Sequence, residues 1–162
     1  SVVAAGAASP DLVGPAVFRT WLDIAANGTI TVYSPDIECG QGINTALAML
    51  VAEELDADWR SLRVVQSGSD EIYASPLSHH VATNSSASVR FRFEQMRRIG
   101  AMARECLKQA AATRWRVPVT ELTTADSLVT HAGSRRRATY GSLAAAAATL
   151  LIAALADQAA RS

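Results

Sequence analysis

The feature that most constrains the fold of this chain is a change of hydrophobic period on either side of a glycine-rich loop. Residues 29–33 alternate polar and apolar side chains, which predicts a strand. Residues 43–55 carry apolar side chains at helical spacing, which predicts an amphipathic helix. The loop between them, 34–42, contains one proline and two glycines. A strand that leads through such a loop into a helix is typical of a mixed α/β domain.

The rest of the chain continues this mixed pattern. Residues 20–24 alternate again, and Asn27-Gly28 predicts that they form a β-hairpin with residues 29–33. Residues 62–66 are predicted to be a strand, either of a second hairpin or of a crossover. Further on, the pattern predicts a long helix over 88–115 ended by Pro118. One face of this helix is traced by Val89, Phe93, Met96, Ile99, Gly100, Ala103 and Leu107, with charged residues opposite. A small hairpin of 121–124 and 127–131, with 135–140 as its return, and an alanine-rich helix from Tyr140 follow.

These elements predict one fold class and one main domain. The class is α/β (α+β), with a β-hairpin, a helix, a strand, a long helix, a small hairpin and a terminal helix in that order. Residues 1–16 are rich in Ala, Gly and Pro, which predicts an extended arm. Residues 17–162 are predicted to form a single domain.

The charge balance bears on the partners of the chain. Lysine plus arginine and aspartate plus glutamate both number 15, so the formal net charge is +0. This balance gives no electrostatic reason to expect nucleic acid or a membrane surface, and the arginines are interpreted as solvated helix and hairpin faces. No stretch is long and apolar enough to span a bilayer. A chain near its isoelectric point is less protected from self-association, so a homo-oligomer is among the expected partners.

The cysteines and histidines do not form a metal site by their spacing. Cys39 and Cys106 are too few for a disulfide framework or a four-ligand zinc site, and we expect two free thiols. The adjacent pair His79-His80 is interpreted as polar loop residues, and His131 as structural. The sequence therefore assigns no metal ligand and no catalytic residue.

Two loops are candidates for ligand binding, and each precedes a predicted helix. Residues 38–42 have glycines that permit positive φ, the Gln41 amide, and the free N–H groups of a helix N-terminus that Asn44 or Thr45 would cap. Five of the six residues 83–88 carry hydrogen-bonding side chains. For each loop alone, a turn or cap without a ligand is the better interpretation. Two such loops in one small domain favour a phosphate-bearing ligand between them.

The order and spacing of these motifs carry a resemblance to a known family. The motifs are Asn27–Val32, Glu38–Gly42, Thr45–Leu55 and Thr83–Arg90, and Tyr140–Leu143 adds a late match. Together they resemble the molybdenum-cofactor-binding large subunit of the xanthine oxidase family. The likeness is strongest to its branch of isoquinoline 1-oxidoreductases and bacterial aldehyde dehydrogenases, and it covers residues 21–148.

The resemblance implies a cofactor, site residues and partners. The cofactor is molybdopterin, in its cytosine dinucleotide form. The site residues are Gly40, Gln41 and Gly42, which match the loop that contacts the pterin, and Thr83, Asn84, Ser85, Ser86, Ala87 and Ser88, which match the loop that holds the pterin and the phosphates. The complete enzyme would be a molybdenum hydroxylase that oxidises an N-heterocycle or an aldehyde with water as oxygen source. The implied partners are the remainder of the large subunit and a [2Fe–2S] small subunit.

Departures from the family pattern keep a second interpretation open. Cys39 stands where the family usually has Met, and Asn84 and Ser85 stand where it usually has two glycines. No residue here matches the catalytic glutamate near the far end of the family's subunit, so this chain alone is expected to be catalytically incomplete. The alternative is a non-catalytic α/β interaction module that binds no cofactor. The bacterial cytoplasm and the periplasm are both open as locations.

Overall fold

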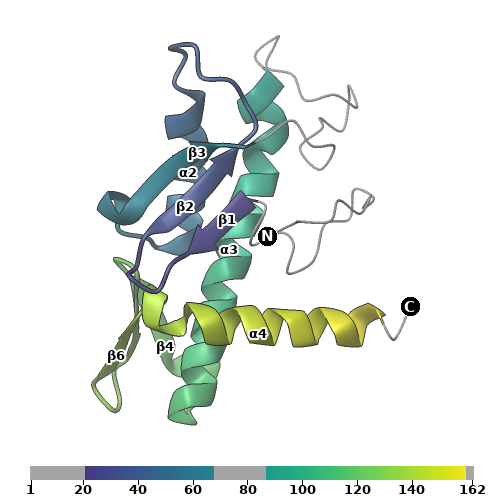
Figure 1. Ribbon diagram of the computed structural model, residues 1–162. Coiled ribbons are helices and arrows are strands. Elements are labelled where there is room, and N and C mark those ends of the chain that lie inside the picture. Colours follow the sequence, from purple (N-terminus) through teal and green to yellow (C-terminus); the bar gives the residue numbers. More distant parts are fainter. Residues whose placement is uncertain (1–20, 68–86, 160–162) are drawn as a thin grey trace.

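The turn at Asn27 and Gly28 folds the first part of the chain into the predicted hairpin. The computed structural model describes residues 21–67 and 87–159 (Figure 1). Strand β1 (Leu22–Ile24) pairs antiparallel with β2 (Ile30–Ser34). Gly28 in the turn has a φ of 89°, which glycine adopts at little cost. The arm expected for residues 1–16 lies outside the described residues.

A helix connects β2 to a parallel strand. Helix α2 (Ile43–Leu55) is followed by the 3₁₀ turn η1 (Trp59–Ser61) and by β3 (Leu62–Gln66). Strand β3 runs parallel to β2. Because β2 pairs with both β1 and β3, the sheet has the order β1-β2-β3. Of the two alternatives for residues 62–66, the structure has the crossover. The reason is that α2 returns the chain to the end of the sheet where β2 began.

A second, antiparallel sheet forms from the C-terminal half of the chain. It consists of β4 (Leu122–Ala125), β5 (Leu128–His131) and β6 (Arg136–Thr139), and the 3₁₀ turn η3 (Val119–Glu121) precedes it. Asp126 and Ser127 between β4 and β5 both have positive φ, 48° and 60°. A two-residue turn of this kind matches the twist of an antiparallel pair. The predicted hairpin and its return strand are confirmed.

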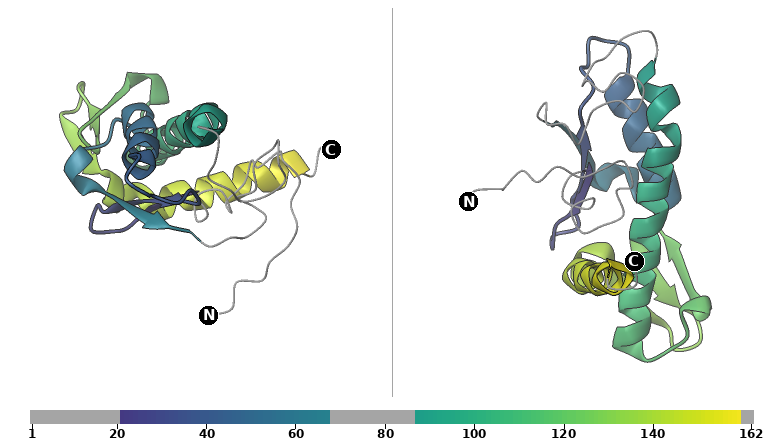
Figure 2. Two further views of the ribbon diagram at one scale, coloured as in Figure 1. Left: turned by 90° about the horizontal axis from the view of Figure 1, so that it is seen from above. Right: turned by 90° about the vertical axis from the view of Figure 1, so that its right-hand side faces the viewer.

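Two further helices hold the sheets together. Helix α3 (Ala87–Trp115) runs along both sheets, and α4 (Tyr140–Ala159) starts directly after β6 and crosses α3 (Figures 1 and 2). Helix α3 stops at Trp115, because Arg116 turns the chain with a φ of 56°. The helix therefore ends at Trp115, as predicted, and Pro118 follows shortly after its end. The predicted fold class is confirmed.

One part of the core lies between the first sheet and the pair α2 and α3, which cover one face of that sheet (Figure 2). The same cluster extends to the second sheet and α4 through Val129, Tyr140 and Leu143. Helices α2 and α3 approach closely at Gly100, where an added Cβ would lie 2.7 Å from the carbonyl oxygen of Val51. Leu22, Ile30 and Val32 supply the buried face of the sheet. The helices contribute the buried side chains of Leu47, Val51, Leu55, Met96, Ile99, Ala103 and Leu107.

The apolar face predicted for α3 is buried over most of the helix, but not at the start of the helix. Val89 and Phe93 were expected on this face, but they are 39% and 40% exposed. Arg92 is buried instead, and it lies four residues before the buried Met96. The guanidinium of Arg97 lies over the ring of Phe93, 5.4 Å from its centre. Among the described side chains of α3, the first buried one is therefore a charged residue.

Two smaller expectations concern the cysteines and the membrane. Cys39 is exposed and Cys106 is half-buried, and both are free thiols as predicted. Burial, with the charge of Glu105 as a smaller cause, raises the pKa of the Cys106 thiol. Within residues 21–67 and 87–159, no helix combines the length and hydropathy that a bilayer crossing requires.

Candidate functional site

The parallel pair β2 and β3 places the loop before α2 and the start of α3 at one end of the first sheet. The chain leaves the carboxyl end of β2 into the loop before α2, and it leaves the carboxyl end of β3 towards α3. Both helices begin at this end of the molecule (Figure 1). In open α/β sheets, ligands bind at the carboxyl ends of the strands. The topology therefore places the loop before α2 and the start of α3 where a ligand site is expected.

A buried ion pair ties the start of α3 to the loop before α2. Arg92 Nε donates to Asp36 Oδ2 at 2.6 Å, and the two side chains are 7% and 2% exposed. The guanidinium of Arg92 also lies over the Trp21 ring, 5.1 Å from its centre. Neither charged residue was predicted from the sequence to belong to the site. Two features of the sequence could have indicated the pair. Asp36 lies two residues after the predicted strand, and Arg92 lies four residues before the apolar Met96, on the same side of the helix.

The carboxylate of Glu38 occupies the N-terminus of α2. Its Oε1 accepts hydrogen bonds from the N–H groups of Gly40 at 2.9 Å and Gly42 at 3.0 Å, and its Oε2 accepts one from Asn44 at 3.1 Å. The N–H groups of Gly42 and Asn44 are the main causes that lower the pKa of Glu38. The expectation that Asn44 or Thr45 caps the helix is wrong. Gly42 is the N-cap residue, with a φ of 80°. Because glycine has no side chain, the Glu38 carboxylate accepts the hydrogen bonds that a capping side chain would otherwise accept.

The amide of Gln41 is oriented by its own loop. Its Oε1 accepts from the N–H of Cys39 at 2.7 Å, and its Nε2 donates to the carbonyl oxygen of Ile37 at 2.8 Å. An amide nitrogen carries two hydrogens, so Nε2 has a second donor to offer. Gly40 has a φ of 95°, and an added Cβ at Gly40 or Gly42 would meet no atom within 4 Å. The loop therefore presents an oriented amide beside open glycine faces.

The remaining predicted site residues are placed only in part. Ser88 lies in α3 as expected, and Ala87, which was expected in the preceding loop, is the first residue of the helix; their side chains are not described. Thr83, Asn84, Ser85 and Ser86 lie outside the described residues, as does the pair His79-His80. In the described parts of the chain, no group of three or more His, Cys, Asp or Glu side chains is arranged to hold a metal ion.

His131 lies in β5 of the second sheet and not in the loop before α2. Its Nε2 is 2.8 Å from Glu121 Oε2, and its Nδ1 is 2.7 Å from the hydroxyl of Ser134. These contacts join β5 to η3 and to the turn before β6. They support the structural role expected for this histidine.

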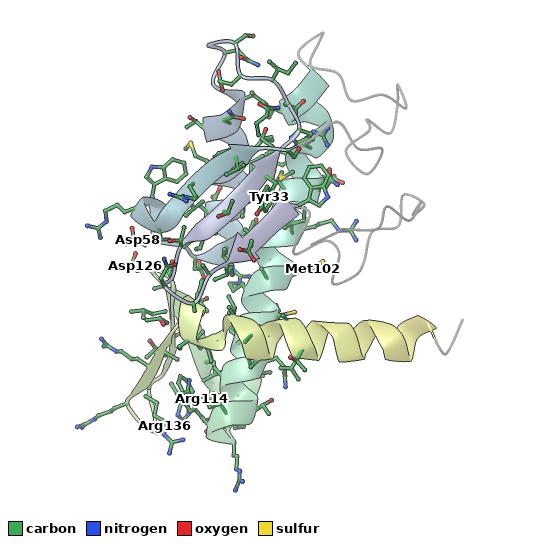
Figure 3. The ribbon with its side chains drawn as sticks, viewed as in Figure 1. Tyr33, Asp58, Met102, Arg114, Asp126 and Arg136 are labelled. Carbon is green, nitrogen blue, oxygen red and sulfur yellow. The ribbon has the colours of Figure 1, made fainter. Side chains whose placement is uncertain are left out.

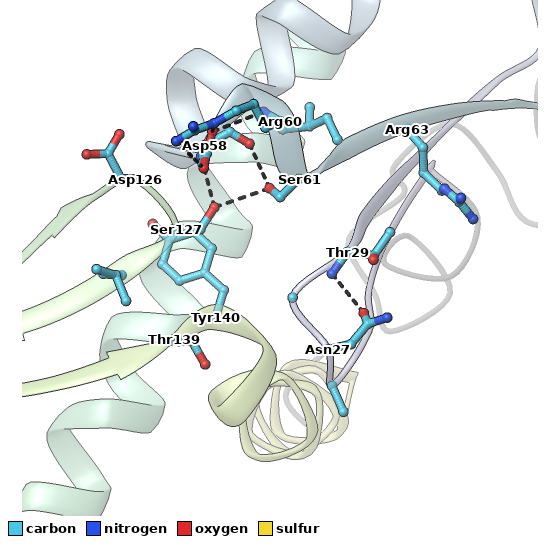
Figure 4. Close-up of a pocket in the computed structure, with 14 residues that line it drawn as sticks. Asn27, Thr29, Asp58, Arg60, Ser61, Arg63, Asp126, Ser127, Thr139 and Tyr140 are labelled. Carbon is cyan, nitrogen blue, oxygen red and sulfur yellow. Dashed lines mark hydrogen bonds and ion pairs between the residues drawn. The ribbon is translucent and has the colours of Figure 1, made fainter.

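A crevice of about 610 Å³ lies where the two sheets meet (Figure 4). Its lining includes residues just before β2 and at the start of β3, whereas Gln41 follows the end of β2. The N–H of Asp58 donates to Ser127 Oγ at 2.9 Å, and this bond closes one side. The side-chain hydrogen bond from Arg60 lowers the pKa of Asp58, so the two charges offset each other. The described lining includes neither a histidine nor a cysteine. We therefore assign the crevice no chemistry.

The arginines are distributed along the molecule and several pair with carboxylates. Figure 3 shows Arg114 and Arg136 near the lower end of α3 and the second sheet, away from the loop before α2. Arg97 pairs with Glu54 between α3 and α2, and Arg104 lies 3.5 Å from Asp56. Arg97, Arg114 and Arg136 agree with the interpretation of the arginines as solvated faces, but that interpretation is wrong for Arg92, which is buried against Asp36.

Comparison with known proteins gives a consistent result. A family model described as "Molybdopterin cofactor-binding domain" matches residues 3–160. The beta subunit of isoquinoline 1-oxidoreductase from Brevundimonas diminuta is 45% identical over 129 residues, which are 78% of this chain. The membrane-bound aldehyde dehydrogenase [pyrroloquinoline-quinone] of Gluconacetobacter polyoxogenes is 32% identical over 71% of this chain. The chain spans 16% of the length of the first relative and 14% of the second.

A solved structure supports the same fold. Quinoline 2-oxidoreductase from Pseudomonas putida 86 superposes with a TM-score of 0.57 at 23% identity. The match covers 77% of this chain and 15% of the solved chain. At this identity the likeness concerns the fold alone.

Proposed function

The chain belongs to the molybdopterin cofactor-binding domain family, and on this premise we propose that its loop Glu38–Gly42 holds the pterin of a molybdenum cofactor through Gln41. Gly40 and Gly42 would let the pterin approach the backbone. The loop 83–88 would supply the second half of the site, with Thr83, Asn84, Ser85, Ser86, Ala87 and Ser88 towards the pterin and its phosphates. In this proposal, residues 17–162 act as one cofactor-binding domain behind the arm 1–16.

The geometry around Gln41 supports the fit of such a group. The amide of Gln41 is exposed, its direction is set by Cys39 and Ile37, and Nε2 has a second hydrogen to donate. The open faces of Gly40 and Gly42 leave room for a flat ring beside the backbone. The ion pair of Arg92 and Asp36 holds the start of α3 beside this loop. The bound cofactor would supply the redox chemistry, and this chain would orient it.

The substrate, the cofactor form and the partners follow as finer parts of the proposal. One relative is named for isoquinoline and the other for an aldehyde, which supports an N-heterocycle or an aldehyde as the substrate class, with water as oxygen source. The cofactor is proposed in its cytosine dinucleotide form. Because the chain spans 16% of a relative called a beta subunit, we propose the remainder of a large subunit and a [2Fe–2S] subunit as its partners.

Cofactor content of the complete native enzyme tests the proposal. We expect molybdenum and pterin in the purified assembly, and severalfold less of both after Gln41→Ala, because the oriented amide is lost. Gln109→Ala is the matched control, since Gln109 is exposed on α3 away from the loop. A native assembly with neither molybdenum nor pterin would overturn the proposal and favour the non-catalytic interaction module.

Cys39 offers a second readout that is independent of turnover. Its exposed thiol lies in the same loop as Gln41. We expect the bound cofactor to shield this thiol, so alkylation should be slower in the loaded assembly than in the cofactor-free one. Equal rates in the two forms would count against a cofactor at this loop.

A further inference from the structure

We propose that Glu38 is a positioning residue: it fills the N-terminus of α2 with a carboxylate of the chain itself and so fixes the direction of the Gln41 amide. The role of Glu38 at the N-terminus of α2 is inferred from the hydrogen bonds of the loop alone. The consequence for cofactor binding rests on the proposed function of Gln41.

The contacts of Glu38 account for the first turn of the helix. The N–H groups of Gly40 and Gly42 converge on Oε1, and the N–H of Asn44 reaches Oε2. The N–H groups of Gly42 and Asn44 are among those that a helix N-terminus otherwise leaves without partners, and the N–H of Gly40 belongs to the loop before the helix. Hydrogen bonds to a charged acceptor are the stronger kind, and a negative charge at this end also complements the helix dipole. One side chain thereby satisfies three backbone donors at once.

The same contacts determine where Gln41 points. Gln41 lies between Gly40 and Gly42, and both neighbours are held by the same oxygen of Glu38. Both glycines have positive φ, so without a tether this stretch would have many conformations of similar energy. The tether leaves the amide of Gln41 within reach of Cys39 and Ile37. The loop is therefore ordered before a ligand arrives, which lowers the entropic cost of binding.

Glu38 also changes which ligand group α2 can receive. A phosphate at the helix N-terminus would meet the carboxylate and would lack the three N–H donors that Glu38 already uses. Because the loop 38–42 precedes a helix, its sequence predicted a site for an external anion. The structure assigns the anion to the chain itself. The ligand groups left for this loop are those that the Gln41 amide can bond, such as a ring nitrogen or a carbonyl.

Amide hydrogen exchange and pterin content in the complete native enzyme test this role together. In Glu38→Gln, the charge is removed, and the side-chain nitrogen replaces an acceptor opposite the N–H of Asn44. We expect the amides of Gly40, Gly42 and Asn44 to exchange about tenfold faster. We also expect the pterin content to fall as far as in Gln41→Ala. Glu53→Gln is the matched control, because it removes one exposed charge from the same helix.

The outcomes separate this inference from the proposed function. Faster exchange with normal pterin in Glu38→Gln, while Gln41→Ala loses pterin, would overturn the positioning role and keep the proposed function. Normal pterin in Gln41→Ala would overturn the proposed function and, with it, the consequence for the cofactor. The proposal that Glu38 holds the N-terminus of α2 would still be tested by the exchange rates in Glu38→Gln. Unchanged rates would overturn it.

A second variant tests whether the carboxylate takes the place of an external anion. In Glu38→Ala, inorganic phosphate should slow the exchange of the three amides, because the helix N-terminus is then open. In the native protein, inorganic phosphate should leave these rates unchanged. Equal slowing in both would contradict the assignment of Glu38 as the internal anion.

Discussion

Arg92 Nε lies 2.6 Å from Asp36 Oδ2, and this buried pair joins the first turns of α3 to the loop that precedes α2. The two residues are far apart in the sequence, but the parallel arrangement of β2 and β3 brings their segments to one end of the sheet. The pair therefore sets the spacing between the Gln41 loop and the helix that follows residues 83–86.

Removing one partner of this pair should destabilise the fold strongly. Arg92→Met leaves the Asp36 carboxylate buried without its cation, and we expect a loss of about 3–5 kcal/mol in the free energy of unfolding. Urea denaturation of the chain measures it. Replacing both residues, Arg92→Met with Asp36→Leu, should recover most of the loss. Arg60→Ala in the exposed pair with Asp58 should have little effect. A change below about 0.5 kcal/mol in Arg92→Met would contradict the structural role of the pair.

Gly100→Ala should destabilise the chain although alanine is the better helix former. The new Cβ would lie 2.7 Å from the Val51 carbonyl oxygen and 3.0 Å from Glu54 Cβ, so α2 and α3 would have to separate. We expect a loss of about 1–3 kcal/mol in the free energy of unfolding. The control is Arg98→Ala, an exposed position on the same helix. A stabilised Gly100→Ala variant would show that the helices do not meet there.

Tyr140→Phe should weaken the contact between the start of α4 and the end of α2. The buried hydroxyl of Tyr140 donates to the carbonyl oxygen of Leu55 at 2.6 Å. Burial, with the charge of Asp56, also raises the pKa of Tyr140 well above its usual range. The loss of the bond should cost about 1–3 kcal/mol in thermal or urea unfolding. Tyr33→Phe, on a partly exposed tyrosine, should unfold like the native chain.

The contribution of Glu38 to stability should depend on pH. Its pKa is lowered in the folded chain, so the charged form stabilises the fold above the pKa of the unfolded chain. This stabilisation is lost as the pH falls through the lower, folded pKa. The native chain and Glu38→Gln should therefore differ more in stability at neutral pH than at about pH 3. A difference that stays constant over this range would contradict the charged cap.

The sequence was sufficient for the local elements and for the family. The period of the apolar side chains predicted the hairpin, the helices and the second sheet, because strand and helix periods differ and each stretch is long enough to express one of them. The resemblance to the molybdenum-cofactor-binding subunit is confirmed by the family match over residues 3–160. The assignment of individual site residues stays a prediction, and the experiments on Gln41 address it.

The start of α3 shows where pattern alone was insufficient. Val89 and Phe93 are apolar, so their spacing predicted a buried face, yet Arg92 is buried there and Phe93 is partly exposed. A charged side chain can be buried when an opposite charge lies beside it, and that partner, Asp36, comes from a different segment of the chain. Hydrophobic periodicity within one helix contains no information about such a partner.

The sequence by itself determined which segments become strands and helices, that two polar loops precede helices, and the family to which the chain belongs. The tertiary structure decided that β3 pairs parallel with β2 and that Arg92 is buried against Asp36. It also decided that Glu38, rather than an external anion, takes the N–H groups of α2. The period of apolar side chains along a segment reflects the preference of neighbouring residues for helix or strand. These contacts depend on how loops and helices are brought together by packing.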